Sequence, residues 1–331
     1  MKLRELGKTG HFVSPIGLGM AALGRPGYIT LGHAADLERD YELEVMQARA
    51  DEVLDAAWRA GVRYFDAARS YGRGEEFLGA WLRARGIDPG AAVVGSKWGY
   101  IYTADWRADA EVHEVKDHSL AVLERQWQES RRNLGSYLRL YQIHSATLAS
   151  GVLANLPVLR ALARLKAEGV AVGLTVSGTD QVEVLSRAIT LRIDGVRLFD
   201  CVQATWNLLE PSAGSELAAA RHEGMGVIVK EALANGRLTE RNREARFATK
   251  RAVLDREAQR LGIGIDALAL AAALAQPWAD VVLSGAATAS QFAANVRALE
   301  ARFDDAAWTA LATLAEEPAA YWKERARLPW N

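Results

Sequence analysis

The stretch Gly61–Gly79, with the sequence GVRYFDAARSYGRGEEFLG, decides how the rest of this chain is interpreted. A short apolar run ends at Asp66, Tyr71 follows five residues later, and a helical pattern begins at Glu75. This pattern predicts a buried strand, a tight loop and the start of a helix. Because an unpaired buried carboxylate is very costly, Asp66 requires a cation at the end of another strand.

Two ionisable residues end the next two predicted strands. Lys97 closes the run at residues 92–96, and His144 closes the next apolar run, at residues 138–143. In a parallel barrel the carboxyl ends of the strands meet on one face, and that face carries the chemistry. We therefore expect Asp66, Tyr71, Lys97 and His144 to share one site.

The motifs around these residues resemble those of the aldo-keto reductase family. They are FDAARSYGRGEEFLG at 65–79, SKWG at 96–99 and LYQIHS at 140–145. The similarity extends from LGKTGHFVSPIGLG at 6–19 to SGAATASQFAANV at 284–296. The resemblance implies that Asp66, Tyr71, Lys97 and His144 form the catalytic tetrad of a nicotinamide-dependent oxidoreductase.

Apolar runs and helical patterns alternate along the whole chain. The predicted strands cover 14–19, 62–66, 93–97, 138–144, 170–177, 199–205, 226–230 and 280–284. The intervening helices include 46–60, 120–134, 157–168, 243–261 and 265–274. Eight such units predict an α/β protein with a closed (β/α)8 TIM barrel, formed as one domain over residues 1–331. A turn at residues 7–10 predicts an N-terminal hairpin, and no G-x-G-x-x-G loop follows the first strand, which argues against a Rossmann domain.

Composition narrows the possible partners. The net charge of −1 gives no support for a nucleic-acid partner, and no apolar run approaches the ~20 residues that span a bilayer. The N-terminus lacks the apolar segment of a signal peptide, and Cys201 has no second cysteine with which to pair. We expect a cytoplasmic protein that acts on a small molecule and that can form a homo-oligomer.

A long insertion follows the first predicted strand. Residues 24–45 begin with Gly-Arg-Pro-Gly and continue into an acidic run from Asp36 to Glu44. One interpretation is a solvated, partly mobile loop, because the segment has little apolar sequence of its own. The alternatives are a lid over the catalytic face or a subunit contact, with Tyr28 near the substrate.

Tyr71 is the predicted proton donor. A free phenol has a pKa of ~10, which a nearby ammonium lowers. We expect Lys97 to supply that charge, Asp66 to hold Lys97, and His144 to bind the substrate oxygen or relay the proton. The alternative is an ordinary buried ion pair beside a core histidine.

The resemblance also implies a groove for NAD(H) or NADP(H). Ser177 and Gln203 would bind the nicotinamide carboxamide, although Gly178 replaces the asparagine that the family usually has there. Lys230 stands where relatives place an aromatic residue to stack on the nicotinamide, so it either pairs with Glu231 or marks a different binding mode. The complete predicted set is Gly19, Met20, Ser177, Gly178, Gln203, Lys230, Leu233, Gly285, Thr288, Gln291 and Asn295.

The loop after the eighth strand bears on which dinucleotide is used. Binding the 2′-phosphate of NADP usually requires Arg or Lys, and residues 284–295 contain neither. Arg297 lies about one and a half helical turns beyond Gln291, and Arg237 could reach across from another loop. The sequence therefore favours NAD(H) slightly.

Aromatic residues just beyond strand ends are candidates for the substrate pocket. These are Trp98, Tyr100 and Trp206, together with Tyr28 from the insertion. Such walls suit a sugar or a flat aromatic carbonyl compound. No cluster of metal-ligating residues is apparent, because the six histidines are scattered.

We expect an NAD(P)-dependent oxidoreductase that interconverts a carbonyl (aldehyde, ketone or sugar) and an alcohol. A sugar dehydrogenase working in the oxidative direction is one alternative. A cofactor-binding regulatory barrel without physiological turnover is another, and a barrel lyase or epimerase is a third.

Overall fold

Eight parallel strands close into a barrel in the computed structural model, which describes residues 1–331. They are β3 (Ile16–Gly19), β4 (Tyr64–Asp66), β5 (Val93–Trp98), β8 (Leu138–Ala146), β9 (Ala171–Val176), β12 (Cys201–Thr205), β13 (Gly226–Lys230) and β14 (Val281–Ser284). Each strand pairs with the next in chain order, and β14 pairs with β3 to close the circle. The predicted (β/α)8 barrel is therefore confirmed.

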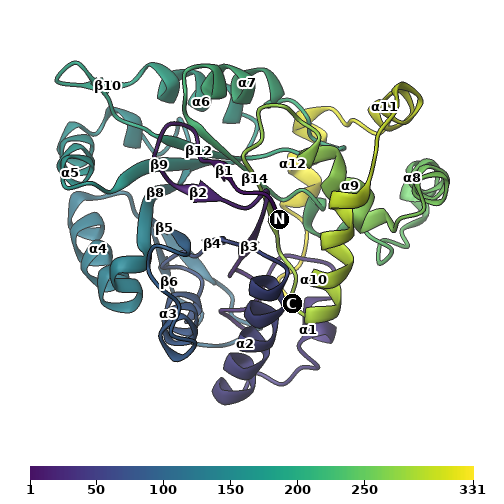
Figure 1. The fold of residues 1–331 in the computed structure, drawn as a ribbon, viewed down its shortest axis with the longest axis horizontal. Helices are drawn as coiled ribbons and strands as arrows, with labels where there is room; N and C mark the ends of the chain where they lie inside the picture. Colours follow the sequence, from purple (N-terminus) through teal and green to yellow (C-terminus); the bar gives the residue numbers. More distant parts are fainter.

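Helices form the outer ring of the barrel (Figure 1). The α-helices are α1 (His33–Asp36), α2 (Leu43–Arg59), α3 (Gly74–Ala84), α4 (Leu120–Leu134), α5 (Leu156–Ala167), α6 (Gln181–Thr190), α7 (Gly214–His222), α8 (Ala248–Leu261), α9 (Ile265–Leu274), α10 (Ala289–Val296), α11 (Asp305–Ala312) and α12 (Pro318–Arg325). Short 3₁₀ turns cover 135–137, 152–154, 234–236, 245–247 and 297–300. None of the helices combines the length and apolarity needed to cross a membrane.

The prediction of a helix over residues 243–261 was wrong at its start. The α8 helix begins at Ala248, after a separate 3₁₀ turn at 245–247. Arg251 explains this boundary, because its guanidinium donates to the carbonyl oxygens of Thr239, Glu240 and Asn242 and holds the preceding chain in an irregular loop.

The N-terminal hairpin closes the base of the barrel, as predicted. Strands β1 (Arg4–Glu5) and β2 (Phe12–Val13) pair antiparallel across that end (Figure 1). Leu6 and Val13 are buried and pack with the innermost barrel side chains, which include Leu140 and Ile228. The interior at this end is therefore a packed core.

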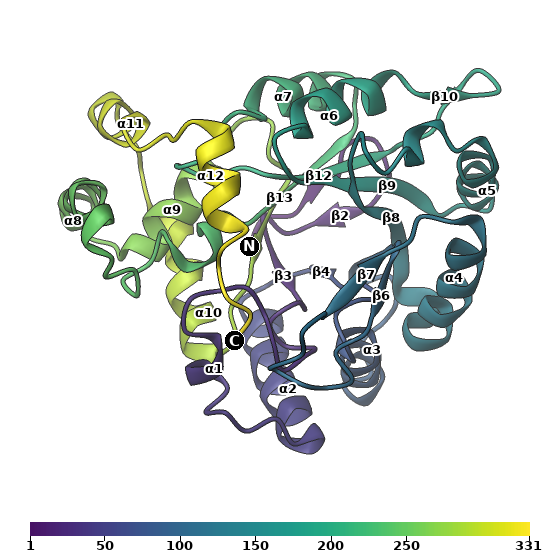
Figure 2. The same ribbon diagram turned by 180° about the vertical axis from the view of Figure 1, so that it is seen from behind.

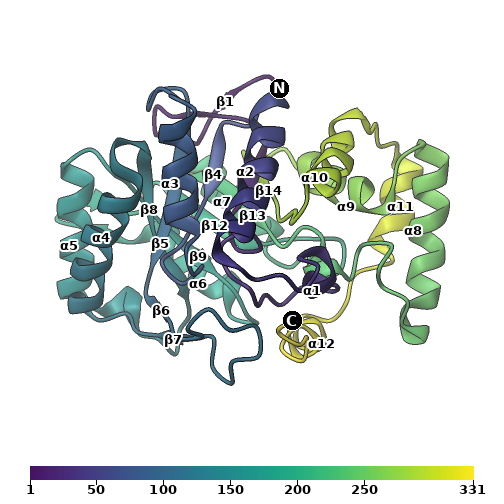
Figure 3. The same cartoon turned by 90° about the horizontal axis from the view of Figure 1, so that it is seen from below.

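The opposite end of the barrel carries the remaining irregular segments. The hairpin of β6 (Tyr100–Tyr102) and β7 (Glu114–Lys116), the α1 segment and α12 with the C-terminal tail all gather there (Figures 2 and 3). A further small hairpin, β10 (Arg192–Ile193) with β11 (Val196–Arg197), lies between α6 and β12. The gathered segments surround the carboxyl ends of the barrel strands.

The insertion at 24–45 is a solvated loop only in part, because its first residues are buried while most of its acidic run is exposed or half-buried. Residues 22–27 are buried, and Leu37 belongs to the main hydrophobic core. The segment is also paired with the C-terminus, because Tyr28 N–H donates to the Asn331 carbonyl oxygen over 3.1 Å and Asn331 N–H donates back over 3.3 Å. Two of its acidic side chains pair with arginines outside the segment, Asp36 with Arg241 and Glu38 with Arg49.

Candidate active site

The four tetrad residues converge at the open end of the barrel. Asp66 ends β4, Tyr71 lies in the loop before α3, Lys97 is in β5 and His144 is in β8. The Lys97 ammonium forms an ion pair with Asp66, donates to the Ala67 carbonyl oxygen over 2.9 Å and lies 3.3 Å from the Tyr71 hydroxyl. One buried ammonium therefore joins the carboxylate to the phenol.

Asp66 is fixed by more than its ion pair. Its Oδ1 accepts hydrogen bonds from the Tyr64 hydroxyl at 3.1 Å and from the Gln203 amide at 2.9 Å. Gly95 makes room for the Tyr64 side chain, because a Cβ at position 95 would lie 2.4 Å from the Tyr64 hydroxyl. These bonds compensate a buried charge that would otherwise be costly.

His144 is held beside Tyr71 with a neutral ring. Burial lowers the pKa of His144 well below its ordinary value, and the Lys97 charge lowers it further. The ring lies edge-on to Tyr71 at 5.6 Å and to Tyr100 at 4.9 Å between centroids. Its Nδ1 is 3.4 Å from the Ser70 hydroxyl, so the imidazole can act as a neutral hydrogen-bonding group.

The pKa of Tyr71 differs from the expectation based on Lys97 alone. Burial raises the pKa of Tyr71 well above its ordinary value, and the Asp66 carboxylate raises it further, whereas Arg25 acts in the opposite direction. Because Asp66 largely neutralises Lys97, the phenol does not experience an isolated ammonium. Tyr71 is therefore protonated at neutral pH, as a proton donor must be.

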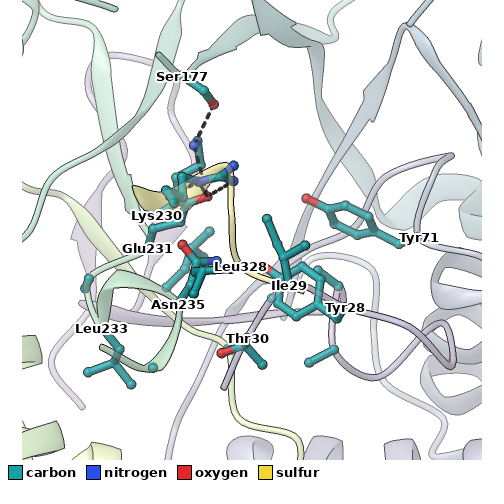
Figure 4. Close-up of a pocket in the computed structure, with 18 of the residues that line it drawn as sticks. Tyr28, Ile29, Thr30, Tyr71, Ser177, Lys230, Glu231, Leu233, Asn235 and Leu328 are labelled. Carbon is teal, nitrogen blue, oxygen red and sulfur yellow. Dashed lines mark hydrogen bonds and ion pairs between the residues drawn. The ribbon is translucent and has the colours of Figure 1, made fainter. Parts of the chain in front are cut away.

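A cavity of about 660 Å³ opens at this end of the barrel and exposes Asp66, Tyr71 and His144 in its wall. Figure 4 shows the Tyr71 hydroxyl directed into the open space between the insertion and the end of β13. Tyr28 and Tyr100 also line the cavity, in agreement with their predicted place. The volume falls within the range usual for small-molecule sites.

Trp98 and Trp206 do not line the cavity. Both are buried in the main core, where Trp98 packs against His118 and Trp206 packs against Trp278. Their side chains leave β5 and the end of β12 toward the helices rather than toward the barrel mouth. The indoles in the wall are instead Trp322 and Trp330, from α12 and the C-terminal tail.

Most of the predicted cofactor residues share the cavity wall. Those in the wall are Gly19, Ser177, Gly178, Gln203, Lys230, Leu233, Gly285, Gln291 and Asn295. Met20 is buried in the core, and Thr288 caps α10 by accepting the Gln291 backbone N–H over 3.2 Å. A Cβ built at Gly178 or Gly285 would meet no atom within 4 Å, so both glycines border open space. The wall therefore fits an extended ligand such as a dinucleotide.

Lys230 points along the wall toward neighbouring strand ends. Its ammonium donates to the Ser177 hydroxyl at 2.9 Å (Figure 4) and to the Thr205 hydroxyl at 2.8 Å. Glu231 lies 3.8 Å away and is bound mainly by the Arg325 guanidinium. Burial lowers the pKa of Lys230 to about 8, against the opposing effect of Glu231. The suggested pairing with Glu231 is therefore secondary to the two hydroxyl contacts.

Two arginines at this end of the barrel, Arg237 and Arg241, are already paired with carboxylates. Arg237 forms two hydrogen bonds with Glu316, at 3.0 and 2.7 Å, and does not line the cavity. Arg241 lines the cavity but is bound through both terminal nitrogens to Asp36. Each would have to leave its carboxylate to bind a 2′-phosphate.

The family model described as "Aldo/keto reductase family" matches residues 15–316. The chain belongs to the aldo/keto reductase family. It is thus an oxidoreductase that interconverts carbonyl compounds and alcohols and uses a nicotinamide dinucleotide. The geometry agrees with that chemistry, because Tyr71 and His144 present a protonated phenol and a neutral imidazole to one cavity.

The individual relatives compared with this chain share less than 30% sequence identity with it. Pyridoxal 4-dehydrogenase of Microbacterium luteolum is 29% identical over 259 residues, which cover 68% of this chain and 69% of the relative. Aryl-alcohol dehydrogenase [NADP(+)] of Phanerodontia chrysosporium is 26% identical over 236 residues, covering 69% and 57% respectively. The holo form of an aldo-keto reductase from Bacillus halodurans superposes with a TM-score of 0.72 at 22% identity, covering 96% of this chain and 97% of that one. This last likeness concerns the fold alone.

Proposed function

We propose that this reductase acts on aromatic aldehydes and the corresponding aryl alcohols, with Tyr71 moving the proton. The observation that carries the proposal is the Tyr71 hydroxyl, which opens on a cavity walled by aromatic rings and lies 3.3 Å from the Lys97 ammonium. Tyr28, Tyr100 and Trp330 contribute aromatic rings to the cavity wall, which a ring-shaped substrate can contact. Relatives named for pyridoxal and for aryl alcohols support the same substrate class.

In the reductive direction the substrate oxygen would lie between the Tyr71 hydroxyl and the His144 ring. A bound nicotinamide dinucleotide supplies the hydride, and Ser177, Gln203 and the loop at 284–287 would hold it. Tyr71 donates its proton as negative charge develops on the substrate oxygen, and Lys97 stabilises the phenolate that remains. The neutral His144 ring orients the carbonyl by a hydrogen bond.

A substrate panel tests this proposal. We expect a higher kcat/KM for benzaldehyde-type carbonyls than for aldoses of similar size, because an aromatic substrate gains ring contacts with Tyr28, Tyr100 and Trp330 that an aldose cannot match. Turnover is followed by the absorbance of the reduced nicotinamide in both directions. Preferential oxidation of a sugar would instead identify a sugar dehydrogenase. Cofactor binding with no turnover of any carbonyl or alcohol would favour the regulatory barrel or the lyase.

We further propose that NAD(H) is used at least as well as NADP(H). The loop at 284–287 and α10 offer no cation, and the Arg237 and Arg241 side chains are committed to Glu316 and Asp36. Quenching of the fluorescence of the ten tryptophans gives the dissociation constant of each dinucleotide. A preference for NADP(H) of about tenfold, ~1.4 kcal/mol, would contradict the proposal. Arg241 lines the cavity and would then be one candidate for the phosphate, which an Asp36→Asn variant would test.

A further inference from the structure

A second buried cation, in addition to Lys97, lies against the Tyr71 ring. The Arg25 guanidinium, with a side chain only 3% exposed, has its central carbon 5.2 Å from the centre of the Tyr71 ring. The same carbon lies 5.4 Å from the Tyr28 ring and 4.8 Å from the Trp330 ring. Arg25 is thus enclosed by three aromatic rings, one of which is the proton donor.

The polar contacts of Arg25 tie it to the tyrosine loop. Its Nη1 donates to the Ser70 carbonyl oxygen over 2.9 Å, immediately before Tyr71, and to the Glu114 carboxylate of β7 over 2.9 Å. The two backbones also touch, because Arg73 N–H donates to the Gly24 carbonyl oxygen over 2.8 Å. A Cβ at Gly24 would lie 2.4 Å from the Tyr71 carbonyl oxygen. The start of the insertion is therefore locked against the catalytic loop.

Several charged and titratable groups face the phenol from the elements packed around it. They are Asp66 and Tyr64 of β4, Lys97 of β5, His144 of β8, Glu114 of β7, Glu231 after β13, and Arg25 and Tyr28 of the insertion. Burial raises the pKa of Tyr71, and Asp66, Glu114 and Glu231 raise it further, whereas Arg25 lowers it. Arginine keeps its charge at every working pH, and burial limits the screening of its field by water.

We propose that Arg25 is a positioning residue for proton transfer: its guanidinium fixes the Tyr71 loop through Ser70 and stabilises negative charge on the phenolic oxygen, while Glu114 limits that effect. This inference rests on the proposed role of Tyr71 as proton donor. It gives the first residues of the insertion a function in the chemistry, in addition to a place in the cavity wall.

Opposite pH shifts in two variants test the proposal. In Arg25→Met the limb of the kcat/KM pH profile that reports Tyr71 should move to higher pH by about one unit. In Glu114→Gln the same limb should move to lower pH, because the opposing carboxylate is gone. Arg25→Lys keeps the charge and should retain most of the wild-type position. A merely structural role for the Arg25–Glu114 pair would impair both variants without moving the limb in opposite directions.

The outcomes separate this inference from the proposed function. A wild-type profile in both variants, or a shift of both in the same direction, would overturn the role of Arg25. If Arg25→Met does not fold, as judged by circular dichroism, Arg25→Gln replaces it, and the absence of an upward shift in that variant overturns the proposal. Full activity in Tyr71→Phe would overturn the proposed function itself, whatever the Arg25 variants show.

Discussion

Tyr71→Phe should turn over its carbonyl substrate at least ~100-fold more slowly than the wild type, with nearly unchanged affinity for the dinucleotide. The substitution removes one oxygen atom, which lies 3.3 Å from the Lys97 ammonium and opens on the cavity. The ring itself keeps its edge-on contact with His144 at 5.6 Å between centroids, so the site should retain its shape. The expected loss is therefore a loss of proton donation.

Steady-state turnover and the dissociation constant of the reduced cofactor are the two measurements that check this. Tyr102→Phe is the matched control, because its hydroxyl is buried without a hydrogen-bond partner and the residue does not line the cavity. It loses the same atom from a tyrosine outside the cavity wall and should keep near wild-type turnover. Turnover of Tyr71→Phe close to that of the control would remove Tyr71 from the mechanism.

The barrel and the tetrad could be predicted because both follow from local pattern. Each barrel strand is an apolar run, and the ends observed differ from the predicted ones by at most two residues. Asp66, Lys97 and His144 stand at strand ends, and a closed parallel barrel places all such ends together. The proximity of these three residues could therefore be predicted without knowing the structure of the loops.

The cavity wall could not be predicted in the same way, because it is built from segments far apart in the chain. Trp98 ends β5 and Trp206 directly follows β12, yet both indoles are buried in the core. Trp330 reaches the site only because the tail pairs with Tyr28, about 300 residues earlier in the chain. The burial of Arg25 depends on that same pairing and on the β6–β7 hairpin, which has no strong signal in the sequence.

Lys97→Met should be nearly inactive and also less stable, and the two effects have separate causes. Lys97 is 1% exposed and Asp66 is 2% exposed, so the variant leaves a buried carboxylate without its cation. Breaking one side of a buried ion pair costs about 3–5 kcal/mol of folding free energy. The hydrogen bonds from Tyr64 and Gln203 to Asp66 remain in the variant and partly compensate the unpaired charge of this carboxylate. Activity falls because no ammonium is left to stabilise the Tyr71 phenolate.

The double variant Asp66→Asn with Lys97→Met separates these causes, measured as urea midpoint and as turnover. Removing both charges eliminates the unpaired carboxylate, so the midpoint should recover much of the loss seen in Lys97→Met, as expected for coupled neighbours. Turnover should stay as low as in the single variant, because the phenol still lacks its cation. Recovery of activity together with stability would mean that Lys97 serves only to neutralise Asp66, and that Arg25 alone supports the charge on Tyr71.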